Sequence, residues 1–335
     1  MISEKRFNEL LNNFSSLGSV LVVGDLGVDK YTMGEVSRIS PEAPVPIVEV
    51  YKEWNKLGLA ANVSDNLRSL GIQSTTCGVI GDDNHGNIFE NLLEENKLST
   101  WGVVRCEGRP TIFKERVVTN TQQICRVDYE LNSAIASDDE DRLTTRIEEF
   151  DGVHSSVIIE DYGKGLISEK LAQYLIQRAK EKKQLVAVDP SRITPPMWYR
   201  GANLLKPNKI ESELMAKALG YQEKDVKKIS TILLDKLDLE TIVITLGAEG
   251  MLVATKDKPD DFKIIPTFAR EVFDVSGAGD TAISTIMAAL MAGGTIEEAV
   301  WIGNLASGVV VGKKGTALAT IDEIKEFYQY SLAHQ

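Results

Sequence analysis

The chain has 335 residues, of which 43% are apolar and 26% charged, as in a globular protein rather than a disordered one. Its formal net charge of −12 excludes a general nucleic-acid or anionic-membrane binder, which needs a basic face, but leaves room for a small anionic substrate where cations gather locally. At roughly 150 residues per domain, the length suggests about two domains, or one large α/β domain with an insertion.

Cysteine and histidine predict no disulfide framework and no zinc site, because the three residues of each kind are scattered along the chain. No apolar run approaches the roughly 20 residues that span a bilayer, and the polar start of the sequence does not resemble a signal peptide. We therefore expect a cytoplasmic protein with no membrane partner.

Apolar strands alternate with amphipathic helices along most of the chain. The periodicity predicts a surface helix over 3–14, a buried strand over 20–23 and a helix over 60–70. Further strands are predicted over 156–160, 185–189, 203–205 and 241–246, and the helices among them over 168–183, 209–219 and 223–236. This order favours a mostly parallel sheet with helices on both faces.

Two stretches break the alternation. Residues 30–53 and 110–130 are rich in β-branched residues and show no helical period. They predict antiparallel strands outside the main sheet, which form a small β lid on the α/β core. We expect one domain over 1–335 with this lid inserted.

The segment Asp274-Val-Ser-Gly-Ala-Gly-Asp280-Thr281 has the strongest local signal for a site. Its small residues Gly277, Ala278 and Gly279 precede an apolar helix predicted over about 280–292. Free N–H groups and the positive end of the helix dipole favour a phosphate there, and bare backbone lets the anion approach closely. The Asp280 carboxylate is then placed to take a proton from an attacking hydroxyl. A tight glycine turn with an aspartate N-cap is the alternative interpretation.

Four segments in this order resemble the ribokinase-like, phosphofructokinase-B type sugar kinases. They are Gly58-Leu-Ala-Ala-Asn62-Val-Ser, Asn208-Lys-Ile-Glu211, Thr245-Leu-Gly247-Ala-Glu-Gly250 and the segment that contains Asp280. The resemblance implies a three-layer α/β/α core, ATP and Mg²⁺ as cofactors, and Asp280 as general base with the Gly277, Ala278 and Gly279 amides around the transferred phosphoryl group.

The same resemblance implies roles for other residues. The sugar side comprises Asp25, Asp29, Gly58, Asn62 and Asp161, and the nucleotide side Thr245, Gly247, Gly250, Asn304 and Lys313. Asn208 and Glu211 lie three apart on the first turn of a helix and would hold Mg²⁺ through water. Simpler readings stay open: helix caps for Asn62, Asn208 and Glu211, a turn residue for Asp25, and hairpin glycines for Gly247 and Gly250.

A narrower resemblance is to the D-glycero-β-D-manno-heptose 7-phosphate kinases of ADP-heptose and lipopolysaccharide synthesis. It rests on Ser37-Arg-Ile-Ser-Pro-Glu-Ala-Pro-Val-Pro46, on Lys114-x-Arg116 and on Asp161-Tyr-Gly-Lys-Gly165. It implies transfer of the γ-phosphoryl group to the anomeric hydroxyl, and a homodimer through the lid. The lid cations would select a phosphorylated sugar, unless they only protect an edge strand: Arg38, Lys114, Arg116 and Arg126.

Four departures from this pattern concern the sugar pocket. Leu59 stands in place of a second glycine, Gly27-Val28 in place of bulkier residues, Asn120 in place of arginine and Ser191 in place of lysine. A ribose, fructose or phosphofructose kinase is therefore the first alternative, and a catalytically silent binding protein with a kinase fold the second. A dinucleotide oxidoreductase is excluded, because Gly24-Asp-Leu-Gly27 lacks the G-x-G-x-x-G spacing.

Overall fold

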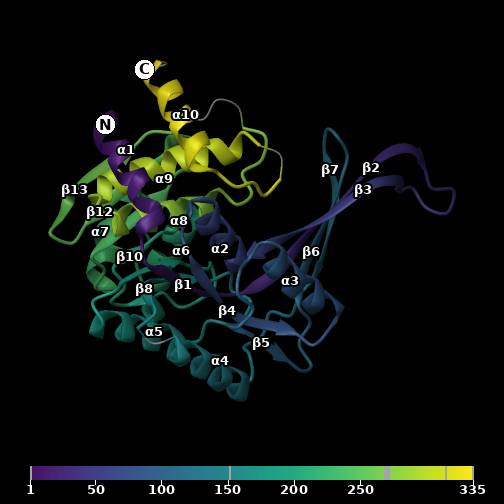
Figure 1. Cartoon of the computed structure of the whole chain (residues 1–335), viewed down its shortest axis with the longest axis horizontal. Helices are drawn as coiled ribbons and strands as arrows, with labels where there is room; N and C mark the ends of the chain where they lie inside the picture. Colours follow the sequence, from purple (N-terminus) through teal and green to yellow (C-terminus); the bar gives the residue numbers. More distant parts are fainter. Residues whose placement is uncertain (1, 151, 268–271, 314, 334–335) are drawn as a thin grey trace.

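A nine-stranded sheet forms the centre of the protein, whose computed structural model describes residues 2–150, 152–267, 272–313 and 315–333 (Figure 1). Its strand order is β13-β12-β11-β10-β9-β8-β1-β4-β5. All neighbours from β5 to β11 pair in parallel, whereas β12 and β13 add on as antiparallel strands. The strands are β1 (Ser19–Gly24), β4 (Ser74–Gly81), β5 (Val103–Cys106), β8 (His154–Glu160), β9 (Leu185–Asp189), β10 (Leu204–Leu205), β11 (Thr241–Thr245), β12 (Met251–Thr255) and β13 (Lys258–Ile265).

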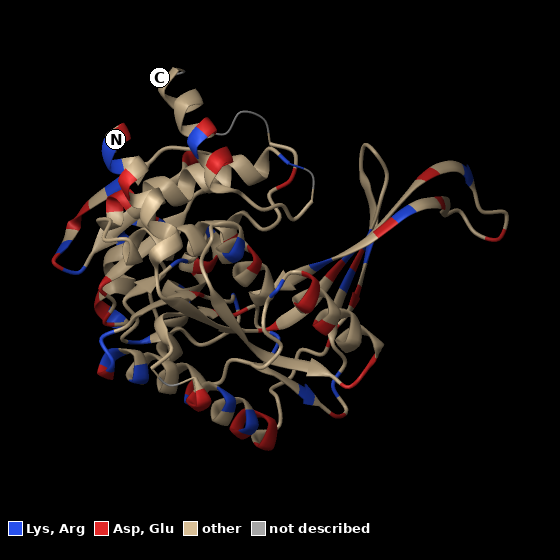
Figure 2. Ribbon diagram, in the orientation of Figure 1, with Lys and Arg blue, Asp and Glu red and all other residues tan. Residues whose placement is uncertain are grey.

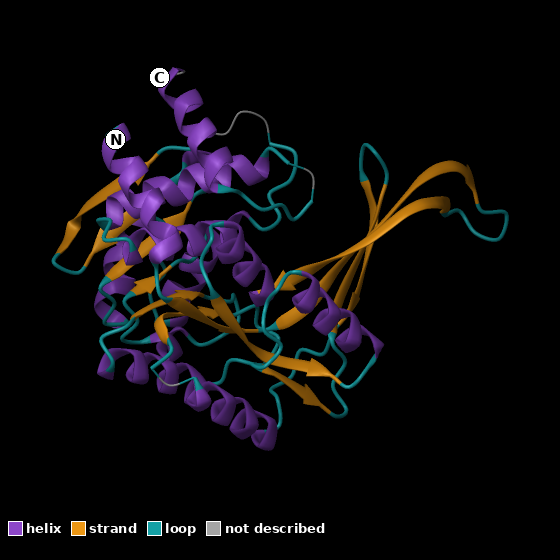
Figure 3. Ribbon diagram, viewed as in Figure 1, coloured by secondary structure: helices purple, strands orange, loops and turns teal. Residues whose placement is uncertain are grey.

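Helices cover both faces of this sheet (Figure 3). Strand side chains alternate between the faces, so Val20 and Val22 pack into one core and Leu21 and Val23 into the other. The first core is closed by α1 (Glu4–Asn13), α2 (Ala60–Ser69), α3 (Asn84–Glu95), α8 (Ala278–Met291), α9 (Ile296–Val311) and α10 (Ile321–Ala333). The second is closed by α4 (Ser137–Glu149), α5 (Glu169–Glu181), α6 (Lys209–Ala218) and α7 (Val226–Lys236). The predicted three-layer α/β/α architecture is thus confirmed.

Each predicted strand and helix of the core is present, and its ends match the prediction or differ by up to three residues. The helix predicted from about residue 280 begins at Ala278, because Gly277 adopts a left-handed backbone conformation and serves as its N-cap. The helix that follows begins with a capping box of Thr295 and Glu298, whose spacing in the sequence favours a helix start. Short 3₁₀ turns lie at Phe14–Ser16, Pro196–Tyr199 and Gly247–Glu249.

A second sheet of four strands projects from the core as a long twisted ribbon, the lid sheet (Figure 1). Its strands are β2 (Leu26–Ile39), β3 (Pro46–Leu59), β6 (Ile112–Val118) and β7 (Gln123–Tyr129), in the order β3-β2-β6-β7. The lid is present where the sequence predicts it, but one detail differs. β2 and β6 pair in parallel, because each belongs to a separate hairpin and both hairpins leave the core in the same direction.

None of the helices in the described part of the chain is both long enough and apolar enough to cross a membrane.

Candidate active site

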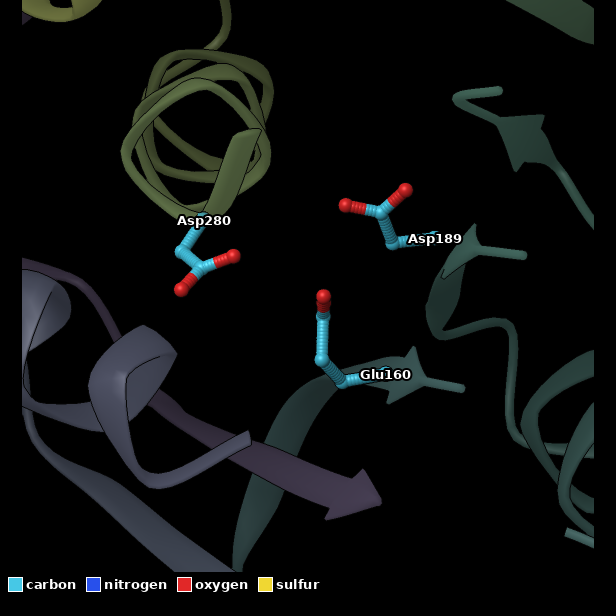
Figure 4. Close-up of side chains that lie close together, drawn as sticks. All are labelled: Glu160, Asp189 and Asp280. Atoms are coloured by element: carbon cyan, nitrogen blue, oxygen red, sulfur yellow. The ribbon is translucent and has the colours of Figure 1, made fainter. Parts of the chain in front are cut away.

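Polar side chains gather at the edge where the parallel strands end. Glu160 is the last residue of β8 and Asp189 the last of β9, while Lys206 directly follows β10. The first turn of α8 brings Asp280 to the same place, where its carboxylate faces those of Glu160 and Asp189 (Figure 4). Ligands of open parallel sheets bind beyond this edge, so the candidate site lies here.

The side chain of Asp280 is held from two sides. Asn62 Nδ2 donates a hydrogen bond to Oδ2 of Asp280 at 2.6 Å, and the Tyr162 hydroxyl donates one to Oδ1 at 2.8 Å. Burial raises the pKa of Asp280 to about 6, although these two hydrogen bonds act to lower it. The carboxyl therefore changes charge close to neutral pH, as a general base requires.

The start of α8 leaves backbone donors open. Gly277 has φ +80°, and a Cβ there would meet Asn62 Nδ2 at 3.2 Å and a Thr316 methyl at 3.0 Å, so a larger residue would be strained. The Ala278 N–H donates to Val275 O at 3.2 Å. The N–H groups of Gly277 and Gly279 have no acceptor among the described residues, so the turn offers two of the three predicted donors to an anion.

Asp25 follows β1 and organises a loop of the site. Its carboxylate accepts backbone hydrogen bonds from Tyr162, Lys164 and Leu166 at 3.1, 3.1 and 3.3 Å. Burial, with a smaller effect of the Asp161 charge, raises the pKa of Asp25 to about 6. This loop carries Tyr162, whose hydroxyl donates a hydrogen bond to Asp280. Asp25 therefore helps to position that tyrosine.

Asp161 is committed to neighbouring loops. It accepts hydrogen bonds from the Gly163 N–H at 2.6 Å, from the Thr194 hydroxyl at 2.7 Å and from the Tyr199 hydroxyl at 2.6 Å. Burial raises the pKa of Asp161 despite these bonds. The Asp161 side chain thus connects the loop after β8 to the segment after β9.

Asp29 lies on the face of the lid sheet that carries Arg116 and Lys56. Arg116 Nη1 donates to Asp29 Oδ1 at 2.6 Å, and the Thr316 hydroxyl lies 3.4 Å from Oδ2. Lys56 donates to the Thr316 carbonyl oxygen. Gly58 makes room for the carboxylate of Asp29, because a Cβ at position 58 would lie 3.2 Å from Asp29 Cγ. These contacts connect the lid to the segment after α9.

The other lid cations are paired with carboxylates. Lys114 Nζ lies 2.5 Å from Glu130 Oε2, and Arg126 binds both oxygens of Asp128 at 2.8 Å. The strand register places Lys114 beside Asp29 and Arg126 beside Arg116, on one face of the sheet. Charges of both signs therefore alternate along the lid instead of forming a purely basic patch (Figure 2).

Arg38 lies far from this group. It is nine residues along β2 from Asp29, which is about 30 Å of extended strand. Its exposed side chain has Glu49 as its neighbour, at 3.9 Å. Within one chain, Arg38 thus does not join the other site residues.

Asn208 and Glu211 form a capping box at the start of α6. The Glu211 N–H donates to Asn208 Oδ1 at 2.9 Å and the Asn208 N–H to Glu211 Oε2 at 2.8 Å. The second Glu211 oxygen lies 3.7 Å from Arg192 Nε. Burial raises the pKa of Asp189, and the negative charge of Glu211 adds to this rise, so this helix start lies near the carboxylates at the sheet edge.

Three of the predicted nucleotide-side residues lie near one another. Thr245 ends β11 and pairs with Asn208 in an isolated bridge. The Thr267 hydroxyl lies 3.2 Å from the Gly247 carbonyl oxygen and 3.4 Å from Asn304 Oδ1. Thr267 therefore links Gly247, in the turn after β11, to Asn304 on α9.

Gly250 and Lys313 have structural explanations of their own. Gly250 has φ +104°, and a Cβ there would lie 2.0 Å from the Ile265 carbonyl oxygen, as expected of the hairpin glycine that the sequence left open. Lys313 lies beyond the end of α9, where its amine contacts Leu318 O at 2.7 Å and Glu323 Oε1 at 2.5 Å.

Two of the departures in the sugar pocket are physically linked. Leu59 has φ +57°, in the left-handed region that glycine favours, and directly precedes α2. Its buried side chain packs against Gly27, where an added Cβ would lie 3.0 Å from Leu59 Cδ1. A Cβ at position 27 would meet the Ile112 carbonyl oxygen first, at 2.5 Å, so the glycine makes room for the neighbouring lid strand and also for the leucine.

Sequence reasoning missed Tyr162, Lys56, Glu160 and Lys206. Tyr162 lies inside the motif Asp161–Gly165, but nothing local shows its contact with Asp280, which is 118 residues away, and Lys56 carries no signal, because its partner Thr316 is 260 residues away. Glu160 ends a predicted strand and Lys206 follows another, so the rule on strand ends points to both.

A mostly parallel sheet covered on both faces, a projecting β lid and a carboxylate at a glycine-bounded helix start together define a ribokinase-like sugar kinase. Solved structures share this fold. Phosphofructokinase-2 from Escherichia coli in complex with potassium has a TM-score of 0.75 at 19% identity, over 94% of this chain and 99% of that one. Arabidopsis thaliana ribokinase complexed with ribose and ATP has a TM-score of 0.70 at 17% identity, over 93% and 98%.

Sequence comparison identifies the family. The model of the pfkB family carbohydrate kinases matches residues 34–323, so the chain belongs to this family and is a carbohydrate kinase. Among curated proteins, it is 39% identical over 313 residues to the bifunctional protein HldE of Wolinella succinogenes and 41% identical over 312 residues to that of Aliarcobacter butzleri. These matches cover 93% and 92% of the chain, but only 65% and 64% of the relatives.

Proposed function

We propose that this kinase transfers the γ-phosphoryl group of ATP to the anomeric hydroxyl of D-glycero-β-D-manno-heptose 7-phosphate, giving the 1,7-bisphosphate used for ADP-heptose and lipopolysaccharide synthesis. The position of Asp280 at the start of α8, beside open backbone donors, is the observation that carries the reaction type. The lid motifs and the similarity to proteins named HldE support the choice of sugar. The kinase would act in the cytoplasm, as the sequence predicts.

In this proposal Asp280 accepts the proton of the sugar hydroxyl. Asn62 and Tyr162 orient its carboxylate so that one geometry is held through the reaction. The N–H groups of Gly277 and Gly279 then stabilise charge on the transferred phosphoryl group. Closure of the lid over the sugar would exclude water and so limit hydrolysis of ATP.

The residues present fit Mg²⁺ and ATP. The carboxylate and amide oxygens of Glu211 and Asn208 suit a cation that keeps several waters, although the capping box already uses one oxygen of each. Mg²⁺ would supply charge neutralisation of the phosphates. Thr245, Gly247 and Asn304 would lie on the nucleotide side, and Gly277 and Gly279 on the phosphate side.

One assay tests the proposed substrate. ATP consumption is measured with heptose 7-phosphate, fructose 6-phosphate, ribose and fructose under identical conditions. We expect the largest kcat/KM for the heptose 7-phosphate. Preference for an unphosphorylated sugar would contradict the proposed acceptor, and the alternatives named above would take its place.

Arg116→Ala tests how the phosphate of the sugar is recognised. We expect KM for the phosphorylated sugar to rise about 10- to 100-fold, because a charged hydrogen bond is worth about 1.5–3 kcal/mol. Arg126→Ala is the matched control, since Arg126 lies on the same face but its side chain is half exposed and bound to Asp128. Equal effects of the two substitutions would show that Arg116 has no special role.

Tyr162→Phe tests the orientation of the general base. Losing this hydrogen bond raises the pKa of Asp280 further above 6, so the acid limb of kcat/KM moves to higher pH. Activity at pH 6 should therefore fall more than activity at pH 8. Tyr174→Phe, at a surface hydroxyl that contacts Glu148 on α4, should leave the profile unchanged. An unshifted limb in Tyr162→Phe would contradict the role.

A homodimer through the lid is part of the proposal. The outer half of the lid hairpin exposes apolar side chains that a second copy would cover: Val36, Ile39, Val45, Val50 and Tyr51.

A further inference from the structure

Lys164 connects the core of the protein to the base of the lid. It belongs to the loop after β8, two residues beyond Tyr162, whose hydroxyl contacts Asp280. Its Nζ lies 2.6 Å from Oε1 of Glu130, the residue that follows β7. A sugar that lies along this loop with its reacting hydroxyl at Asp280 therefore has its other end beside Lys164.

The backbone of Lys164 is held on both sides. Its N–H donates to Asp25 Oδ2 at 3.1 Å, and its carbonyl oxygen accepts a hydrogen bond from Arg109. Arg109 also binds the carbonyl oxygens of Ser133 and Leu131, at 2.7 and 3.0 Å. Because these bonds hold the main chain, the amine of Lys164 can exchange one anion for another without a change in the loop.

Two lysines share the carboxylate of Glu130. Lys114, on β6 of the lid, places its Nζ 2.5 Å from Oε2, whereas Lys164 contacts Oε1. Although burial acts to raise it, the hydrogen bonds from these two lysines lower the pKa of Glu130 to about 2. The carboxylate is therefore ionised at neutral pH and serves as an internal anion between two ammonium groups.

The charges around Glu130 do not balance. Asp128 is the next carboxylate, 3.5 Å from Lys114 Nζ, but Arg126 binds both of its oxygens. Among the described residues, three cations thus meet two carboxylates at this end of the lid. The side chains of the two lysines and Glu130 are between 13% and 18% exposed, so water screens the excess positive charge only weakly.

A phosphate monoester suits this place better than a carboxylate. It carries about −1.5 to −2 charge at pH 7 and has three acceptor oxygens. We propose that Lys164 and Lys114 bind the phosphate group of the sugar, and that Glu130 occupies this place until the sugar displaces it. This subsite rests on the proposed function, and it adds a lysine of the core and a displaceable carboxylate to the lid cations.

The experiment measures sugar binding by calorimetry without ATP, so that no turnover is needed. The probes are two pairs, heptose 7-phosphate with free heptose and fructose 6-phosphate with free fructose. The wild type should bind the phosphorylated member of at least one pair more tightly. Lys164→Met should weaken that binding about 10- to 100-fold and leave binding of the free sugar within about twofold. Lys170→Met, at an exposed lysine of α5 that contacts Asp141, is the control and should change neither.

Glu130→Gln should have the opposite effect. Glutamine keeps the size of the side chain but removes a negative charge that opposes the phosphate, so the phosphorylated sugar should bind at least about threefold more tightly. A residue that only fastened the lid to the core would weaken binding when it is changed. Tighter binding therefore separates displacement from a structural role, and it tests the subsite even if Lys164→Met fails to fold.

Three outcomes contradict the subsite. They are a wild type that binds neither sugar phosphate better than its free counterpart, equal losses for both members of a pair in Lys164→Met, and weaker or unchanged binding in Glu130→Gln. Turnover of heptose 7-phosphate with no effect of Lys164→Met would leave the proposed function without this subsite. Preference for fructose 6-phosphate with a loss in Lys164→Met would leave the subsite with another acceptor.

Discussion

Asp280→Asn is expected to lower kcat by about a hundred- to ten-thousand-fold, the range typical of a lost general base. Asparagine matches aspartate in shape, so binding of ATP should change little. The measurement is steady-state kinetics with the best sugar of the panel, together with calorimetry of ATP binding. Asp235→Asn, a highly exposed position on α7, is the control and should retain wild-type rates.

The same substitution should stabilise the protein. An amide satisfies both neighbours, because its oxygen accepts from Asn62 while its NH₂ donates to the Tyr162 hydroxyl, which accepts as well as donates. In the folded protein the pKa of Asp280 is about 6, above its ordinary value of 3.8. The ionised carboxylate therefore lowers the stability of the wild type by about 3 kcal/mol.

The stabilisation by Asp280→Asn depends on pH. Below pH 3.8 Asp280 is protonated in both folded and unfolded chains, so the substitution changes nothing. As pH rises towards about 6, the unfolded chain releases its proton first and the wild type loses stability. Urea unfolding should therefore show a gain of about 1–3 kcal/mol for Asp280→Asn at pH 8 and almost none at pH 4. Full kcat in this variant, or no gain at pH 8, would contradict a buried ionised base.

Local patterns were sufficient for the core of the fold. Four consecutive apolar residues from Val20 predict a strand buried on both faces, and Thr295 with Glu298 predicts a helix start. Pairing between distant segments is not encoded in such patterns. The parallel ladder of β2 with β6 joins residues about 85 positions apart in sequence, Gly27 with Ile112 for example, and was missed for that reason.

The candidate site was predictable to the extent that its residues belong to local motifs. Asp280 and Gly277 share one segment, and Asn62 belongs to another, so all three are among the predicted site residues. The sequence did not reveal that Asn62 contacts Asp280, since that contact spans 218 residues. Nor did the lid pattern show that the four cations predicted to select the sugar each have a carboxylate partner, because pairing depends on register.

Asp25 illustrates how one residue type fits two roles. The family resemblance implies contact with the sugar, whereas the structure shows three backbone N–H groups bound to its carboxylate. Asp25→Ala leaves these buried donors without an acceptor, at about 1–3 kcal/mol each before relaxation. We expect a loss of about 3–5 kcal/mol in the free energy of unfolding, measured by urea denaturation at pH 7.

Asp25→Asn separates the two roles. Its remaining oxygen accepts from Tyr162 and Lys164 as Oδ2 does now, while its NH₂ faces the Leu166 N–H unfavourably. Removing a buried charge whose pKa is raised to about 6 offsets that loss, so stability should change by only about 1 kcal/mol. If Asp25 acts only through the loop that carries Tyr162, KM for the sugar stays near the wild-type value in Asp25→Asn. A tenfold or larger rise in KM in this well-folded variant would instead show that the carboxylate binds the sugar directly.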